Sequence, residues 1–102
     1  MVYMTRIISA IFLLSISHMV YSETTRGGYA GCVTEEYLDQ LFDALAKDDK
    51  NAVNYLSSNL KCVPLQEGLQ ISVLDRGFAT SKIRVYVGND SVELYVPSEA
   101  IK

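Results

Sequence analysis

The sequence contains no tryptophan and a single histidine, His18. It also lacks a Gly-rich phosphate loop followed by lysine, and it has no cluster of Lys and Arg. Nine basic residues stand against twelve acidic ones, a net charge of −3. This balance argues against nucleic acid and anionic membrane surfaces as partners. The sequence therefore carries no signature of a phosphate-binding enzyme or of a nucleic-acid-binding protein.

Residues 1–22 have the composition of a secretory signal peptide. The amino terminus and Arg6 form a short positive region, and the apolar run IISAIFLLSIS is too short to span a bilayer as a helix. Val20 and Ser22 suit the −3 and −1 positions of a signal-peptidase site, so we predict cleavage after Ser22, export to the periplasm or beyond, and no remaining membrane anchor. The alternative is an uncleaved N-terminal anchor. Cleavage would remove the histidine, and with it an imidazole base or metal ligand.

Two cysteines, Cys32 and Cys62, follow this segment. An exported chain meets an oxidising compartment, so we predict a disulfide between them. A mature chain of about 80 residues is marginal on core burial alone, and the chain-entropy model gives such a bond roughly 3.5–4 kcal/mol. The alternative is lipidation of Cys32, because Tyr-Ala-Gly-Cys loosely resembles a bacterial lipobox. That alternative places Tyr29 where leucine is usual and leaves Cys62 unpaired.

From Thr34 the apolar residues recur at spacings of three and four, which is typical of a helix running to about Lys47. Thr34 is the expected N-cap of this helix. A second, shorter helix is expected to begin after Asp48 or Asp49. The stripe of the first helix consists of Tyr37, Leu38, Leu41, Phe42, Ala44 and Leu45. The segment 34–60 is therefore predicted to be a helical hairpin whose neighbouring ends carry the two cysteines.

Over residues 61–102 the apolar period changes from 3.6 to 2, which indicates strands. A hairpin turn is expected at Asn89 and Asp90, which tolerate positive φ angles. The resulting register pairs six inward residues: Val87 with Val92, Val85 with Leu94, and Ile83 with Val96. The sequence thus predicts one α+β domain over 34–102, with the helical stripe covering the open face of an antiparallel sheet. The glycine-rich segment 23–33 is expected to be a flexible lead-in.

Three segments, GLQISVLD (68–75), KIRVYV (82–87) and ELYVPSEAI (93–101), resemble the strands and closing 3₁₀ turn of SH3-like domains in exported bacterial proteins. The resemblance covers only the C-terminal part of the chain. It implies a barrel-like antiparallel sheet. The family's Ala-Leu-Tyr strand and the tryptophan of its peptide groove are absent here, so the resemblance does not extend to recognition of proline-rich peptides.

The outward face of the predicted hairpin is the first candidate interface. It opposes Tyr86 to Glu93 and Arg84 to Tyr95, and tyrosine and arginine are enriched where interfaces derive their binding energy. Two alternatives stay open. Arg84 and Tyr95 could form an exposed cation–π pair that needs no partner. The helices could instead cover this face and make the tyrosines part of the core.

Acidic side chains on the first predicted helix form the alternative interface, which consists of Glu35, Glu36, Asp39 and Asp43. Their repulsion at i,i+4 spacing is a weak indication of a basic partner, although a solvated helix face has the same composition. A further alternative is a carboxylate-based hydrolase, which would need a pocket and a perturbed carboxyl group.

These observations together predict a small, non-enzymatic, exported bacterial binding module. Its expected partner is an envelope protein, a secretion or conjugation component, or peptidoglycan. The alternative is a plasmid- or phage-encoded effector, inhibitor, exclusion or immunity protein that acts through the acidic helix. No cofactor, metal or nucleic-acid partner is expected.

Overall fold

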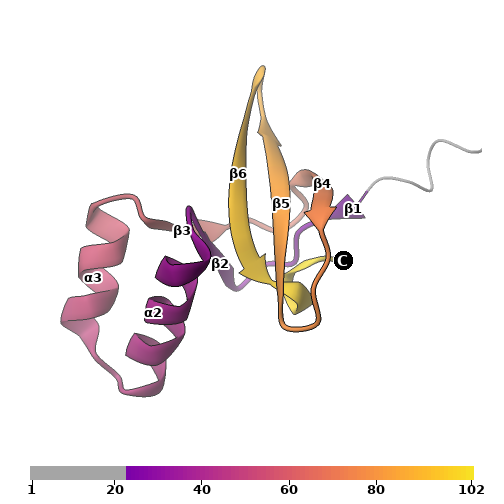
Figure 1. The fold of residues 1–102 in the computed structure, drawn as a ribbon. Helices are drawn as coiled ribbons and strands as arrows, with labels where there is room; N and C mark the ends of the chain where they lie inside the picture. The colour runs from indigo at the N-terminus through magenta and orange to yellow at the C-terminus, as the bar shows by residue number, and fades with distance from the viewer. Residues whose placement is uncertain (1–22) are drawn as a thin grey trace, which may run out of the picture.

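The structure is a computed structural model that describes residues 23–102, and the predicted signal peptide with its cleavage site lies outside them. Two helices lie to one side of a sheet (Figure 1). The elements in chain order are β1 (Glu23–Thr24), β2 (Tyr29–Cys32), α2 (Glu35–Ala46), α3 (Lys50–Ser58), β3 (Cys62–Leu65), β4 (Gln70–Asp75), β5 (Thr80–Val87), β6 (Asp90–Pro97) and the 3₁₀ turn η2 (Ser98–Ala100). The predicted α+β class is confirmed.

All six strands form one antiparallel sheet in the order β1-β4-β5-β6-β2-β3. The edge strands β1 and β3 do not pair with each other, so the sheet is not closed, and the finer prediction of an SH3-like barrel is not confirmed. The C-terminal segment lies across one end. Ile101 bridges Thr25, and the Lys102 N–H donates to the Thr24 carbonyl at 2.8 Å.

The segment expected to be a flexible lead-in, 23–33, contributes β1 and β2 to the sheet, and that prediction is wrong. β2 pairs with β3 along all of its residues and bridges β6 through Cys32. The glycines, which predict a linker, have other purposes here. Gly28 makes a turn at φ 88°, and Gly31 lets β2 approach the core, because a Cβ there would lie 3.0 Å from the Leu94 Cδ1 atom.

The predicted helical hairpin is confirmed, with both caps in place. The Thr34 hydroxyl accepts a hydrogen bond from the Tyr37 N–H at 3.1 Å. The Asp49 carboxylate accepts one from the Ala52 N–H at 3.1 Å, so Asp49 rather than Asp48 begins the second helix. Each cap satisfies a backbone donor that has no partner within its helix.

Buried apolar residues gather in two clusters on opposite faces of the sheet. The sheet cluster consists of Leu65, Ile71, Ile83, Val85, Leu94, Val96, Ala100 and Ile101. The helix cluster consists of Cys32, Leu38, Leu41, Leu56 and Cys62, with Ala30, Tyr37, Val53 and Tyr95 packed against it. Side chains alternate between the faces of a strand. Leu94 and Tyr95 therefore belong to different clusters, and the helices cover the outward face of β2, β3 and β6.

The β5–β6 hairpin is paired two residues away from the predicted register. The observed pairs include Val85 with Val92, Ile83 with Leu94, and Arg84 with Glu93. The turn consists of Gly88, at φ 63°, and Asn89, instead of Asn89 and Asp90. A shift of two residues keeps every side chain on its face. It leaves Val87 and Val92, which were expected inside, exposed near the hairpin tip.

Gly31→Ala is expected to destabilise the fold by about 1–3 kcal/mol, because the added methyl group would press on the core. Its Cβ would lie 3.0 Å from Leu94 Cδ1 and 3.1 Å from Val96 Cγ1. Urea unfolding monitored by circular dichroism measures the change. Gly27→Ala is the matched control, since its Cβ would meet only the side chain and backbone of Glu67 at 3.3 Å or more. Equal losses in the two variants would contradict the proposed close packing of β2.

Candidate functional site

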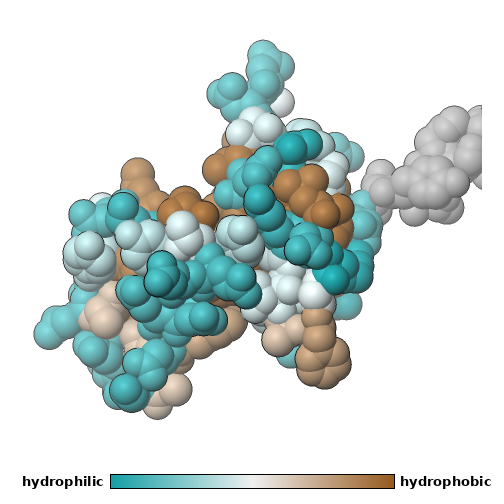
Figure 2. All heavy atoms as spheres, in the orientation of Figure 1, coloured by the Kyte–Doolittle hydropathy of each residue, from teal (hydrophilic) through white to brown (hydrophobic). Residues whose placement is uncertain are grey.

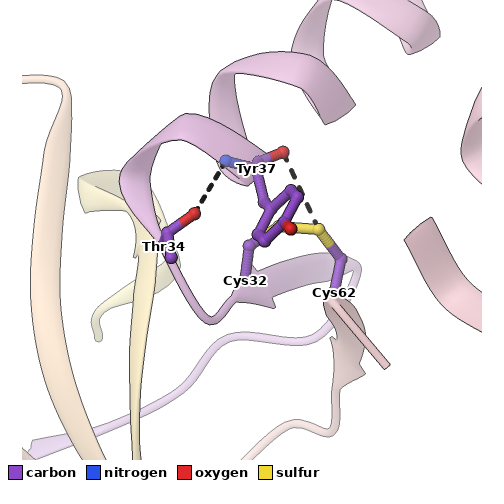
Figure 3. The surroundings of a disulfide bond; sticks show 4 residues. All are labelled: Cys32, Thr34, Tyr37 and Cys62. Atoms are coloured by element: carbon purple, nitrogen blue, oxygen red, sulfur yellow. Dashed lines mark hydrogen bonds between the residues drawn. A yellow bond between two sulfur atoms is a disulfide. The ribbon is translucent and has the colours of Figure 1, made fainter. Parts of the chain in front are cut away.

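The predicted disulfide is confirmed, and it joins directly opposed residues of β2 and β3. Cys32 and Cys62 are bonded at an S–S distance of 2.03 Å, and both are buried. The ring of Tyr37 lies beside the bond (Figure 3), and the backbone carbonyl oxygen of Tyr37 is 3.8 Å from the Cys62 sulfur. Because the sulfur of Cys32 is in the bond, lipidation at this position is excluded in this structure. The bond ties together the two strands that carry the helical hairpin.

The first candidate interface lies on the outward face of β5 and β6, where its charged members bind one another. Glu93 accepts from Arg84 at 3.0 Å through one carboxylate oxygen and pairs with Lys82 at 3.4 Å through the other. The hydrogen bond from Arg84, followed by that from Lys82, lowers the pKa of Glu93. This face therefore presents a paired ion cluster.

Tyr95 belongs partly to the core. It packs against the helix cluster opposite Cys32, so for this tyrosine the helices do cover the face. The Lys82 ammonium lies 5.6 Å from its ring centroid. The expected cation–π partner, Arg84, pairs with Glu93 instead, because the hairpin register differs by two residues.

Tyr86 remains on the surface, with 42 % of its area exposed. Its hydroxyl and that of Ser72 share a hydrogen bond of 2.7 Å. This bond, with a smaller contribution from Arg84, lowers the pKa of Tyr86. Tyr86 is therefore the more exposed of the two tyrosines in the first candidate interface.

All four residues of the alternative interface on α2 are exposed. Asp43 pairs with Lys47 at 3.2 Å. Within residues 23–102, no basic side chain forms an ion pair with Glu35, Glu36 or Asp39. This surface therefore has uncompensated negative charge.

An apolar groove between α2 and the sheet was missed by the sequence prediction. Phe42 and Leu45 belong to the predicted buried stripe, yet 40 % and 59 % of their areas are exposed. Together with Tyr29, Pro64 and Pro97 they line a hollow of about 400 Å³. The stripe of α2 is about 160° wide at 100° per residue, wider than the roughly 100° that one packed face requires. Phe42 lies at one edge of this stripe, so the excess width is the signal in the sequence that could have revealed its exposure. Leu45 lies inside the stripe, between Leu41 and Leu38, and the width does not distinguish it from them.

The groove continues from Phe42 to the loop between β4 and β5. Tyr29, Phe42, Phe78 and Pro97 line a neighbouring hollow of about 490 Å³. Phe78 is wholly exposed at 102 %. In Figure 2 an apolar group projects from the end of the sheet where this loop lies, and a notch separates it from the helices. We call these two hollows together the apolar groove.

Hydrogen bonds hold the loop that presents Phe78. The Ser98 hydroxyl donates to the Gly77 carbonyl at 2.8 Å and shares a bond of 2.6 Å with the Ser81 hydroxyl. Ser81, which is buried, also accepts from the Gly77 N–H at 3.1 Å. The Ser98 N–H donates to the Ala79 carbonyl at 2.9 Å. The exposed phenyl ring is therefore carried by an ordered loop.

Two further observations concern residues 23–102. No group of three His, Cys, Asp or Glu side chains there is close enough to hold a metal ion. No helix in this part of the chain has the length and apolar character needed to cross a membrane.

Comparison of the chain with protein-family models, curated proteins and solved structures finds no match.

The ion cluster on the sheet predicts a pH dependence. The pKa of Glu93 is lower in the folded chain, so its contribution to stability is present above the unfolded pKa of about 4.3 and is lost as the pH falls through the folded pKa. NMR titration of the Glu93 carboxyl should give a midpoint that rises in Arg84→Ala and, by less, in Lys82→Ala. Tyr86→Phe is the control and should not change it. An unchanged midpoint in Arg84→Ala would contradict the assignment.

Ser98→Ala should destabilise the protein by about 1–3 kcal/mol, because it removes a hydrogen-bond partner from buried Ser81 and from the Gly77 carbonyl. Phe78→Ala, on the same loop, should leave the free energy of unfolding unchanged, since the ring is wholly exposed. Chemical denaturation of the two variants in parallel measures both effects. A larger loss for Phe78→Ala than for Ser98→Ala would show that the ring packs in solution.

Proposed function

We propose that this protein is a non-enzymatic binding module that receives an apolar segment of another protein in the apolar groove. The observation that carries the proposal is Phe78, a wholly exposed phenyl ring on a hydrogen-bonded loop beside a hollow lined by apolar side chains. Exposed aromatic residues around a concave apolar surface are typical of binding sites. An ordered loop also lowers the entropy that is lost on binding.

The composition of the groove favours a protein over peptidoglycan as its occupant. Its walls are side chains of Tyr29, Phe42, Leu45, Pro64 and Pro97, which gain free energy by burying apolar area at about 25 cal/mol per Å². Peptidoglycan offers mainly hydroxyl, amide and carboxylate groups. The buried disulfide supports an oxidising compartment. We therefore place the function among exported proteins, with another envelope protein as the partner.

The groove has an energetic advantage over the first candidate interface. A partner on the sheet face would have to compete with the ion pairs of Glu93 and with the hydrogen bond between Tyr86 and Ser72. Phe42 and Phe78 make no such internal bonds, so covering them requires no exchange of existing polar contacts. Among the lining side chains, the hydrogen bond from Tyr29 to Glu99 is the contact that an occupant would have to compete with. Binding in the groove therefore adds apolar burial at a smaller opposing cost than binding on the sheet face.

Photo-crosslinking in the natural host tests the proposal. The photoreactive residue p-benzoylphenylalanine is placed at Phe42, at Phe78, and at two exposed control positions, Tyr55 and Tyr86. We expect positions 42 and 78 to give the same cross-linked partner protein and position 55 to give none. Cross-links from Tyr86 with none from Phe42 or Phe78 would assign binding to the sheet face and overturn the proposal.

A further inference from the structure

The rim of the apolar groove along α2 is acidic. At 100° per residue, Asp39 and Asp43 lie about 60° and 100° to one side of Phe42, and Leu45 lies about 60° to the other. All four side chains are exposed. The apolar wall and these two carboxylates are therefore neighbouring surfaces of one helix. Asp43 pairs with Lys47, whereas Asp39 has no ion pair within residues 23–102. Two of the four residues of the alternative interface predicted from the sequence, Asp39 and Asp43, thus border the groove.

A second acidic group stands at the other end. Glu99 lines the hollow beside Phe78 and accepts a hydrogen bond of 3.1 Å from the Tyr29 hydroxyl. This bond is the main reason that the pKa of Tyr29 is raised. Neither end of the groove presents a lysine or arginine among its lining residues. Basic side chains on an occupant would relieve the repulsion between the carboxylates.

The strand edge beside the groove is poorly suited to pairing with an added strand. The Val33 N–H donates to the Lys61 carbonyl at 2.9 Å, which makes these residues a hydrogen-bonded pair. Because such pairs alternate along an antiparallel ladder, the backbone groups of Cys62 and Pro64 point away from β2. Proline has no N–H, so the free edge of β3 offers one donor, the N–H of Cys62, beside the carbonyls of Cys62 and Pro64. An extended peptide would therefore find a ladder with a single donor.

We infer that the occupant of the groove is an amphipathic α-helix of the partner protein with lysine or arginine along one flank. A helix satisfies its own backbone hydrogen bonds, so it does not depend on the β3 edge. Its apolar residues at i, i+3, i+4 and i+7 pack against Phe42 and Leu45, and its basic flank faces Asp39 and Asp43. This inference rests on the proposed function, and it names the chemistry of the partner.

Three fluorescein-labelled peptides test this with the purified full-length protein. The first has leucine at helical spacing and lysine elsewhere, the second has glutamate in place of lysine, and the third has the first composition with two central prolines. Fluorescence anisotropy at 50 and 500 mM salt measures their dissociation constants. We expect the lysine peptide to bind at least tenfold more tightly than either other peptide at low salt. At high salt, the ratio between the dissociation constants of the glutamate and lysine peptides should be smaller.

Four variants locate the binding. Phe42→Ala, Leu45→Ser and Asp39→Asn should each raise the dissociation constant of the lysine peptide at least fivefold. Tyr55→Ala, which removes an exposed aromatic residue of α3 outside the groove, should not. Circular dichroism of each variant confirms that it is folded. Phe42→Ala and Leu45→Ser test the groove independently, so a loss of binding in both is not the effect of one local distortion.

The outcomes separate the inference from the proposed function. Equal binding of the lysine and glutamate peptides, or no effect of Asp39→Asn, would overturn the basic partner. Binding of the proline peptide as tightly as the lysine peptide would overturn the inference that the occupant is a helix. In both cases a loss in Phe42→Ala and Leu45→Ser would leave the groove as the binding site. Binding that is indifferent to these two variants, or that is equally lost in Tyr55→Ala, would overturn the inference and the proposed function together.

Discussion

The position of β2 between β6 and β3 is the constraint on which the rest of the structure depends. This strand has four residues, and both of its faces are used. Gly31 faces the sheet cluster, where its missing side chain leaves room for Leu94 and Val96. Ala30 and Cys32 face the helix cluster, and Cys32 carries the disulfide. A short strand therefore holds the sheet, the helices and one wall of the groove in a fixed relation.

The helical hairpin and the disulfide could be predicted from the sequence because local chemistry determines them. Thr34 and Asp49 cap the helices through contacts three residues away. The pairing of the two cysteines follows from the predicted signal peptide and an oxidising compartment, and this inference does not depend on the fold. The two wrong predictions, the flexible lead-in and the register of the β5–β6 hairpin, concern residue types that have two structural uses. Glycine predicts both a linker and close backbone packing. Gly-Asn and Asn-Asp are both good turns, so the hairpin register was open to a shift of two residues.

The groove was harder to predict because exposure on α2 is decided by distant parts of the chain. Periodicity identifies Phe42 and Leu45 as members of an apolar stripe, but α3 and the sheet cover only the part that contains Leu38, Leu41 and Ala44. In the first candidate interface too, the sequence pattern gives the face of a side chain but not its exposure. Tyr86 and Tyr95 lie on one face of the sheet, yet the helices reach only Tyr95. Which side chains of a face remain free is a property of packing between elements.

The two edges of the open sheet have a further consequence for the behaviour of the protein at high concentration. An unpaired strand edge is a template on which another copy can assemble. A protein that also has an exposed apolar surface is especially prone to such aggregation. Within residues 23–102, β1 has two residues, and Pro64 interrupts the hydrogen-bond donors of β3. Both edges are thus too short or too discontinuous to extend the sheet from copy to copy. The protein is therefore able to keep a hydrophobic surface open without polymerising through its strands.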